Sequence, residues 1–545
     1  MKKAFLAILA LQVLLMQACI QQENVDMIIH NARVNTIDQS MNTHEALAVK
    51  GGRIIAVGAE HEILNRYVAE NTYDVKGGII FPGFIDAHSH LLGYGLELKR
   101  LNLVGTKSFD EVIDRIKTYT ESTDSEWVLG RGWDQNDWVN KVFPNNDTLS
   151  KLFPNHYIAL KRVDGHAYFA SQNVLEKASI SPHTQVDGGQ IVLDQNGNPT
   201  GVVIDEAMGL ITEILPQIDE NVKRSALSLA QNNVVEKGLT SVCDAGLSIE
   251  DIKLINRMHQ SDLKIRVYAM YSASKSLFKD MASNFIQTDR LTARSVKLYA
   301  DGALGSRGAF LLEPYTDDSL NQGLLITPAD SIYKWAQKCY QNGFQLNIHC
   351  IGDGANRIAL EEMGKVLKGG NDLRWRIEHA QVVSYEDRSK FSQFTIIPSM
   401  QPTHATSDMY WAKERLGSER IETAYALKSL MNENGLIALG TDFPVESIDP
   451  IKTIYAACIR RDENGYPTEG FSIKDKLSRE DAIKGVTIWP AIANFEEENR
   501  GSIEVGKFAD LVLVNRDLLN CTENELLNAE VQKTWINGEL VYDKK

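Results

Sequence analysis

Cysteine is scarce in this chain, and its spacing excludes several classes of protein. There are six cysteines in 545 residues, and no two of them form a CxxC pair. Zinc ribbons, thioredoxin-like redox motifs and small disulfide frameworks all need closely spaced cysteines. Five cysteines follow Cys19, an odd number that cannot all pair within the chain, and they are scattered at positions 243, 339, 350, 458 and 521. We therefore expect free, buried thiols.

Basic residues are also in short supply, and long apolar runs are missing beyond the N-terminus. The chain has 57 Lys and Arg against 72 Asp and Glu, which gives a formal net charge of -15. Such an acidic surface repels phosphate backbones, which argues against nucleic acid as a partner. No later window approaches the roughly 18–20 apolar residues of a membrane span. The composition is that of an ordinary globular protein.

The N-terminus has the order of charged, apolar and small residues that is typical of a secretory signal. Two lysines precede the apolar run AFLAILALQVLLM, and Cys19 follows directly after a small residue. This pattern resembles a lipoprotein signal, in which residues 1–18 are removed and Cys19 is lipidated. Ile20 rather than Asp follows the cysteine, which favours anchoring at the outer membrane, facing the periplasm. Plain signal cleavage, with Cys19 incidental, is the alternative.

Short β patterns occur near both ends of the chain. Residues 26–80 alternate between apolar and polar side chains, with a hairpin turn expected at Gly51-Gly52. Residues 509–515 and 534–542 have the same β-strand pattern of apolar residues, and the second segment is expected to turn at Asn537-Gly538. We predict one small β-sandwich domain that is built from residues 26–80 together with residues 500–545.

The middle of the chain alternates apolar runs of strand length with helical patterns. The helical stretch at residues 353–370 ends in two glycines, as a helix C-cap often does. Eight strands are expected, at residues 79–86, 239–245, 264–271, 294–301, 344–350, 374–380, 394–402 and 436–443. This pattern predicts an α/β fold, a (β/α)₈ TIM barrel over residues 81–499.

Roughly 150 residues separate the first two expected strands, which is far more than one crossover helix needs. Within them, residues 189–205 look like a hairpin that turns at Asn196-Gly197. We expect an insertion at about residues 100–235 that covers the C-terminal face of the barrel, where the active sites of such barrels are built.

Histidine makes up only 12 of the 545 residues, yet several histidines fall at the expected strand ends. His88 and His90 end the first strand, His349 ends the fifth and His379 the sixth, and Asp442 ends the eighth. Imidazole and carboxylate are preferred ligands of zinc and similar ions. Residues i and i+2 of a strand share a face, so the His-x-His pair can reach one ion. A lone His-x-His is commonly a surface accident; the shared strand-end position is what favours a metal site.

Lys297 lies inside the fourth expected strand, among these candidate ligands. A cationic lysine would be repelled by metal ions. In its neutral form, however, it can react with CO₂ to give a carbamate, a carboxylate-like group that can bridge two ions. The alternative is a lysine that pairs with Asp301 or with another acid.

Six segments together resemble the amidohydrolase superfamily, most closely its family 3 branch, which includes N-substituted formamide deformylases. The segments are PGFIDAHSH, KLYADGALGSRGA, NIHCIGDGAN, RIEHAQ, GTDFP and GSIEVGKFADLVLVN, and the resemblance covers nearly the whole chain after the signal. It implies a more buried metal held by His88, His90 and Asp442, and a second held by His349 and His379. Two Zn²⁺ ions bridged by carboxylated Lys297 are then expected, although family members differ in metal count.

The resemblance also implies a reaction, the hydrolysis of a non-peptide C–N bond of a small molecule by a metal-activated hydroxide. Asp442 would act as the general base and then as the acid, and His404 would donate to the developing oxyanion. The substrate contacts implied by the polar and aromatic segments around the pocket are Arg131, Trp133, Asp134, His166, Arg307 and His404. Each of three of these residues also has a purely structural alternative: Trp133 could pack in a core, Arg131 could form an ion pair with Asp134, and Arg307 could anchor its loop.

Two other functions remain open at this point. A deaminase or cyclic-amide hydrolase with one metal ion would leave Lys297 uncarboxylated. A surface-anchored binding lipoprotein would keep the barrel without turnover, but the intact ligand set argues against it. The expected partner is a small-molecule substrate, the expected membrane contact is only the lipid at Cys19, and a homodimer is compatible with the sequence.

Overall fold

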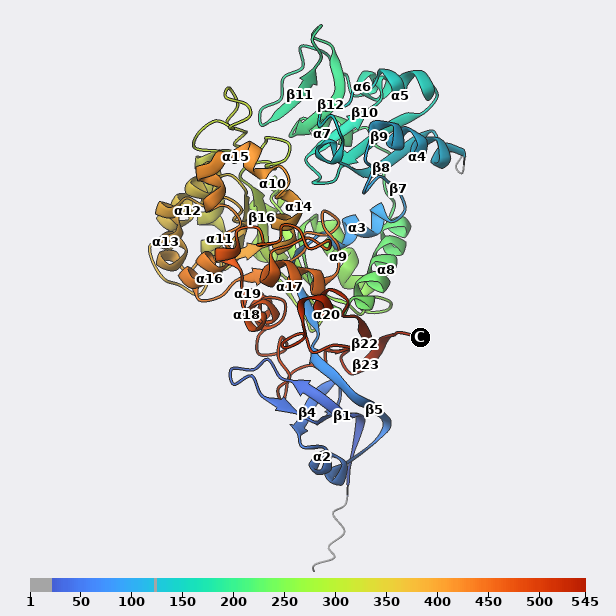
Figure 1. The fold of residues 1–545 in the computed structure, drawn as a ribbon, viewed down its shortest axis with the longest axis vertical. Helices are drawn as coiled ribbons and strands as arrows, with labels where there is room; N and C mark the ends of the chain where they lie inside the picture. Colours follow the sequence, from blue (N-terminus) through green and yellow to red (C-terminus); the bar gives the residue numbers. More distant parts are fainter. Residues whose placement is uncertain (1–21, 122–124) are drawn as a thin grey trace, which may run out of the picture.

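The computed structural model describes residues 22–121 and 125–545, so the predicted signal peptide and Cys19 lie outside the described residues. Three units follow one another along the long axis of the molecule in Figure 1. A sheet made from both ends of the chain lies at the bottom, a barrel occupies the middle, and an inserted sheet lies at the top. Among the described residues, no helix has the length and apolarity that a membrane crossing requires.

The central unit is a barrel of parallel strands, as predicted. Its strands, in spatial order, are β6 (Phe84–Ser89), β13 (Leu239–Leu247), β14 (Arg266–Ser272), β16 (Leu291–Tyr299), β17 (Gln345–Cys350), β18 (Arg376–His379), β19 (Ile397–Met400) and β20 (Ala438–Leu439). Each of the eight predicted segments overlaps one of them. The backbone N–H of Asp442 donates to the carbonyl of His88 at 2.7 Å, so the segment after β20 returns to β6 and closes the barrel.

Alternation along the barrel strands sends polar side chains inward and apolar ones outward. On β17, Leu346, Ile348 and Cys350 belong to the large apolar core that also contains helix residues such as Ile332. The alternate residue His349 therefore reaches the upper end of the barrel interior. The outer helices include α8 (Glu220–Glu236), α9 (Ile249–Met258), α11 (Ala329–Asn342), α12 (Asp353–Leu367), α13 (Tyr385–Phe394), α16 (Leu427–Asn434) and α17 (Pro450–Ile459).

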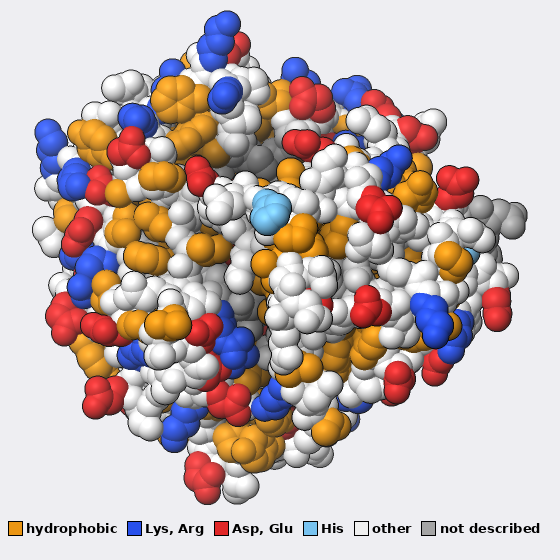
Figure 2. All heavy atoms as spheres, turned by 90° about the horizontal axis from the view of Figure 1, so that it is seen from above, with side chains coloured by type: hydrophobic (Ala, Val, Ile, Leu, Met, Phe, Trp, Pro, Cys, Tyr) orange, Lys and Arg blue, Asp and Glu red, His pale blue; other side chains and the backbone are white. Residues whose placement is uncertain are grey.

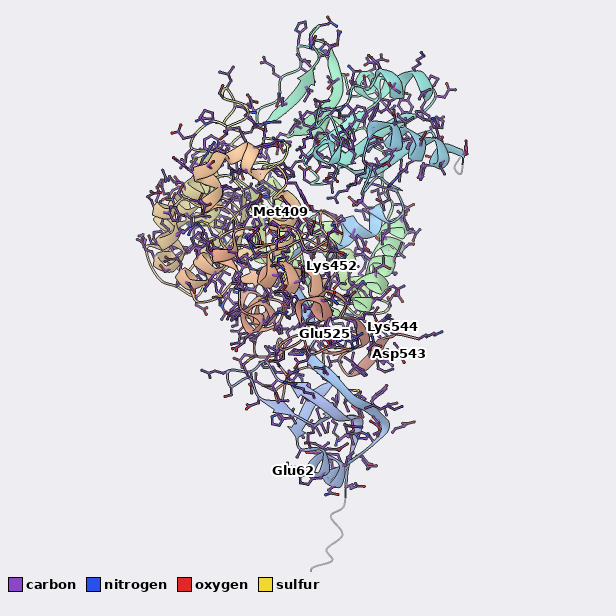
Figure 3. The ribbon with its side chains drawn as sticks, viewed as in Figure 1. Glu62, Met409, Lys452, Glu525, Asp543 and Lys544 are labelled. Carbon is purple, nitrogen blue, oxygen red and sulfur yellow. The ribbon has the colours of Figure 1, made fainter. Side chains whose placement is uncertain are left out.

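The lower unit is one sheet that joins strands from both ends of the chain. Its order is β23-β22-β21-β5-β1-β3-β4, with bounds β1 (Glu23–Asn35), β3 (Ala46–Lys50), β4 (Arg53–Gly58), β5 (Tyr67–Pro82), β21 (Leu511–Val514), β22 (Val531–Ile536) and β23 (Glu539–Asp543). A buried pair between Arg266 of β14 and Asp510, with N–O distances of 2.6 and 2.9 Å, ties this sheet to the barrel. Glu62, on α2 (Glu60–Arg66), lies at the end of the molecule farthest from the inserted sheet (Figure 3).

The upper unit is a second sheet with a hydrophobic core of its own. Its order is β11-β12-β10-β9-β8-β7, with bounds β7 (Leu101–Asn102), β8 (Trp127–Trp133), β9 (Tyr157–Arg162), β10 (Ala167–Ala170), β11 (Gly189–Leu193) and β12 (Pro199–Asp205). The following helix α8 contributes Leu227 and Val234 to the core of the barrel, so the inserted sheet ends before it. The inserted unit faces the barrel across the cavity described below.

The cysteines match the prediction of free thiols. Cys243, Cys339, Cys350 and Cys458 are buried, Cys521 is half-buried, and none of these five forms a disulfide. Burial raises the pKa of the Cys243 thiol to about 12, so this thiol stays protonated and unreactive near neutral pH.

Candidate metal centre

A cavity of about 470 Å³ lies between the barrel and the inserted sheet. Seven of the predicted chemical groups line it together, namely His88, His90, Lys297, His349, His379, His404 and Asp442. They come from β6, β16, β17 and β18, from the segment after β20, and from α14 (Pro402–Asp408). Met409, which directly follows α14, lies on the side of the barrel that faces the inserted sheet (Figure 3). The predicted strand-end cluster is therefore one site in space.

The His-x-His pair at the end of β6 converges on Asp442. His90 Nε2 lies 3.2 Å and His88 Nε2 lies 3.5 Å from the same Asp442 oxygen, Oδ1. That oxygen is buried and has no hydrogen-bond partner among the described residues. Asp442 also has a φ of 59°, in the left-handed region, which is a strained conformation of the kind found at functional sites. Two imidazoles and a carboxylate thus meet at one point.

A buried glutamate sets the orientation of His88. His88 Nδ1 lies 2.5 Å from Oε2 of Glu378, and both side chains are fully buried. Burial, followed by the charge of Lys297, lowers the pKa of His88, so its ring is neutral and Nδ1–H donates to the carboxylate. The lone pair of Nε2 then points toward Asp442 and Lys297. Such a partner behind a histidine is the usual arrangement around a metal ligand.

His379 and His349 lie beside His88 in the same cluster. Nδ1 of His379 lies 2.7 Å from Oε1 of Gln401, an amide oxygen that can only accept, so Nδ1 carries the proton and Nε2 has a free lone pair. The ring of His379 lies 4.6 Å from that of His349 and 4.7 Å from that of His88. Burial, with smaller contributions from neighbouring cations, holds the pKa values of His349 and His379 well below their usual range. Both rings are therefore neutral near pH 7.

Lys297 lies among the same histidines. Its Nζ is 3.2 Å from Nε2 of His88, and its side chain is buried. Burial lowers the pKa of Lys297 to about 8, so about a tenth of it is neutral at pH 7, far more than for an exposed lysine. It forms no ion pair with Asp301, whose carboxylate instead accepts backbone N–H groups of Ile351 and Gly352. The alternative in which Asp301 neutralises Lys297 is therefore not found.

These donors fit a divalent metal ion. Imidazoles and a carboxylate converge, and two groups of three have all their donor atoms within 4.8 Å of one another. The first group is His88, His90 and Asp442, and the second is His379, His404 and Asp442. Burial would raise the pKa of Asp442, but the close imidazole of His90 and the charges of His88 and His379 hold it well below its usual range. The unpartnered Oδ1 of Asp442 is the kind of orphaned buried oxygen that a metal would satisfy.

Two of the predicted substrate contacts reach this centre. His166 comes from the inserted unit, donates through Nδ1 to Asp205 at 2.7 Å, and has its ring 5.3 Å from that of His349. His404 on α14 has its ring stacked on that of His379 at 5.9 Å, and its Nε2 has no hydrogen-bond partner in the described part of the chain. Both side chains line the cavity.

Arg131 and Asp134 also line the cavity, but they do not pair with each other. Arg131 donates to both oxygens of Glu97 at 2.8 Å, and Asp134 pairs with the buried Arg162. The predicted alternative of an Arg131–Asp134 pair is therefore wrong. Both side chains are already held by a neighbouring charge.

Trp133 and Arg307 are corrections to the predicted substrate contacts. Trp133 is 1% exposed, and its indole N–H donates to the carbonyl of Leu160, inside the core of the inserted sheet. A register shift between Arg131 and Trp133 breaks the alternation of β8 and turns the two side chains to different surroundings. Arg307 pairs with Asp317 at 2.9 Å and does not line the cavity, so it anchors its own loop.

Sequence reasoning missed the residues behind the ligands, chiefly Glu378 and Gln401. Glu378 directly precedes His379, and strict alternation would send these two side chains to opposite faces. The φ of 71° at His379 breaks that alternation, so both reach the site. The sequence did hold one signal for Glu378, because a glutamate inside the predicted strand RWRIEHA, directly before a candidate ligand, is unusual. Gln401 offered none, because nothing in its local pattern points to His379.

Replacing Glu378 tests the orientation of His88. We expect Glu378→Gln to weaken metal affinity by about 10–100-fold, because a neutral amide holds the Nδ1–H of His88 less strongly than a carboxylate does. The measurement is a competition titration with a chromophoric chelator. Glu361→Gln, at an exposed position on α12, is the control. Equal affinities in the two variants would mean that Glu378 does not support a metal ligand.

Comparison with known proteins places the chain among metal-dependent hydrolases. A model of the amidohydrolase family matches residues 71–542. The chain is 30% identical to the putative amidohydrolase YtcJ of Bacillus subtilis, over 94% of this chain and 99% of that protein. It is 25% identical to the N-substituted formamide deformylase of Arthrobacter pascens, over 95% of this chain and 98% of that protein. An uncharacterized metal-dependent hydrolase from Pyrococcus horikoshii matches with a TM-score of 0.75 and 25% identity, over 91% of this chain and 99% of that chain.

Proposed function

Because the chain belongs to the amidohydrolase family, as its strand-end motifs predicted, we propose that it hydrolyses the amide-like C–N bond of a small molecule in the cavity above the barrel. It is a metal-dependent hydrolase that acts on C–N bonds, and the finer proposal concerns which bond and which residues. The single observation that carries it is the convergence of His88, His90 and Asp442, with Lys297 beside them, at the floor of that cavity.

The proposed reaction adds water to an amide carbon and releases a carboxylic acid and an amine. His88, His90 and Asp442 would hold a divalent ion, which would supply a hydroxide near neutral pH and polarise the carbonyl oxygen. Asp442 would accept the proton of the attacking water and then pass it to the leaving nitrogen. His404, whose Nε2 lies 3.7 Å from Asp442, donates to the oxygen that gains negative charge.

The inserted unit contributes to the same reaction. His166, held by Asp205, reaches the cavity beside His349 and is positioned to orient the substrate. Burial lowers the pKa of His166, but the hydrogen bond and charge of Asp205 outweigh burial and raise it overall. A partly protonated His166 is suited to donate a hydrogen bond to the substrate.

A screen of amides with one variable part tests the proposed function. Zn²⁺-loaded protein is incubated with N-formyl and N-acyl amines that share one amine, and amine release is measured. We expect hydrolysis of at least one N-formyl or short N-acyl compound, and loss of that hydrolysis when the metal is removed with a chelator. Release of ammonia from amidines or aminopyrimidines, with no amide hydrolysed, would instead favour the deaminase.

The first candidate for the centre has two ions bridged by carboxylated Lys297. A centre with a single ion and an unmodified Lys297 is the second candidate. Its support is the tight group formed by His88, His90 and Asp442 alone. Metal content per chain separates the two forms, because one bound ion with an unmodified Lys297 is expected only for the single-ion centre.

A further inference from the structure

One cation in the cavity wall has no partner. The described residues that line the cavity include four with cationic side chains, Arg131, Lys161, Arg162 and Lys297. Lys297 belongs to the metal centre. Lys161 makes no hydrogen bond through Nζ and no ion pair within 4 Å to any residue that the structure describes. A partly buried ammonium group without a partner is costly, and in proteins it is usually matched by an anion.

The carboxylates that line the cavity on the same side as Lys161 are engaged with other cations. Glu97 is bound by Arg131, while Asp134 and Asp164 are both bound by Arg162. Asp137 pairs with Lys107 at 3.7 Å, and Asp205 is bound by His166. None of these carboxylates forms an ion pair with Lys161.

The fold holds Lys161 facing the space above the metal centre. It lies on β9, paired in register with Arg131 on β8, and the charge of Arg131 adds to burial in lowering the pKa of Lys161 to about 8. Gly165, with a φ of 81°, lies beside the Lys161 side chain: a Cβ built on it would be 3.7 Å from Nζ, an ordinary van der Waals contact. Lys161 is close enough to His166 for its charge to lower the pKa of that ring.

Two further acids, Glu446 and Asp408, line the cavity on its barrel side. Glu446 accepts a hydrogen bond from Ser407 at 2.6 Å, and Asp408 accepts hydrogen bonds from Gln381 and Tyr425 at 3.0 and 2.8 Å. On the face seen from the side of the inserted sheet, acidic and basic side chains are interspersed (Figure 2).

We propose that Lys161 binds a carboxylate of the substrate, on the part that points away from the metal centre, so that the substrates are N-acylated amino acids and related anionic amides. This inference rests on the proposed function for the C–N bond, but the charge recognition is testable without turnover. A neutral amide would leave the ammonium group desolvated and unpaired, whereas a carboxylate would form a charge-assisted hydrogen bond with it.

Binding of dicarboxylates tests the site independently of catalysis. In Zn²⁺-loaded protein, one carboxylate can occupy the metal centre while the other reaches Lys161. We expect at least one dicarboxylate from glutarate to suberate to bind at least about tenfold more tightly than the monocarboxylate of equal chain length, measured by calorimetry. This advantage is expected to disappear in Lys161→Gln and in Lys161→Met, and to persist in Lys161→Arg. Lys151→Gln, at an exposed position on α5 (Asp147–Leu152), is the matched control and should keep it.

Two results would overturn the inference. One is a dicarboxylate series that binds no better than the monocarboxylates in the wild type, and the other is an advantage that survives in both neutral variants. Thermal melting separates a binding role from a structural one. An unpaired ammonium contributes no ion pair to the fold, so we expect Lys161→Met to melt at or above the wild-type temperature.

Turnover of matched compounds separates this inference from the proposed function. For ω-formamido carboxylates against N-formylalkylamines of equal length, we expect the wild type to favour the anionic series at least about tenfold in kcat/KM, and Lys161→Gln to lose that preference. Equal kcat/KM values for the two series in the wild type would contradict the inference. Retained dicarboxylate binding with no hydrolysis of any formamide would support the carboxylate site and refute the formamide chemistry.

Discussion

Asp442→Asn is expected to lower kcat for C–N hydrolysis by about 10³-fold or more, because it removes both a general base and a metal ligand. The side chain keeps its size, but an amide can neither accept a proton from water nor replace a carboxylate as a ligand. The closure of the barrel uses the backbone N–H of Asp442, which the substitution leaves in place, so the variant should fold. Steady-state kinetics at saturating metal give the measurement.

Asp187→Asn, at an exposed position in the inserted unit, is the control and should retain wild-type turnover. Hydrolysis by Asp442→Asn within tenfold of the wild type would remove the assigned role of this residue. Near-UV circular dichroism of both variants shows whether they are folded, so that a loss of activity through unfolding is recognised.

Lys297→Met is expected to reduce the bound metal from two ions per chain to one and to lower kcat/KM by at least about 100-fold. Methionine has nearly the length of lysine but cannot react with CO₂, so the proposed bridging carbamate could not form while the packing is kept. The low pKa of Lys297, about 8, leaves neutral amine available for that reaction near neutral pH. Metal content by mass spectrometry and kinetics on the same samples give the two readouts.

The bridging role has a further signature in the wild type and in a smaller variant. Reconstitution of metal-free wild type should require bicarbonate, and ¹³C-labelled bicarbonate should give a carbamate carbon signal that Lys297→Met lacks. Lys297→Ala should recover activity when formate or propionate is added, because a short carboxylate can enter the space of the bridge. Two ions per chain in Lys297→Met, with full activity, would rule out the bridge.

The barrel and the metal cluster could be predicted because their signals are local and repeated. His88, His349 and His379 each follow an apolar run of strand length, and parallel strands of a barrel must end at a common rim. The shortness of β20 could not be predicted, because residues after Leu439 leave the ladder to let Asp442 turn back onto His88.

The supporting contacts could not be predicted for a physical reason. Trp133 and Arg131 should share a face by alternation, yet a bulge between them sends one to the core of the inserted sheet and the other to the cavity. The roles of Gln401 and Lys161 can be recognised only in the folded chain, where residues that are distant in sequence lie beside them. Such contacts depend on side-chain directions at sequence separations that no periodicity encodes.

A metal titration followed by two readouts tests most directly whether this chain hydrolyses C–N bonds through the cluster above its barrel. Metal-free protein, with bicarbonate present, is titrated with Zn²⁺ while bound metal and hydrolysis of the best amide from the screen are measured on each sample. Hydrolysis should be absent without metal and should rise with occupancy to a plateau at two ions per chain. In Asp442→Asn it should stay near zero throughout. Full hydrolysis by the metal-free protein, or a rate that does not follow occupancy, would contradict the proposal.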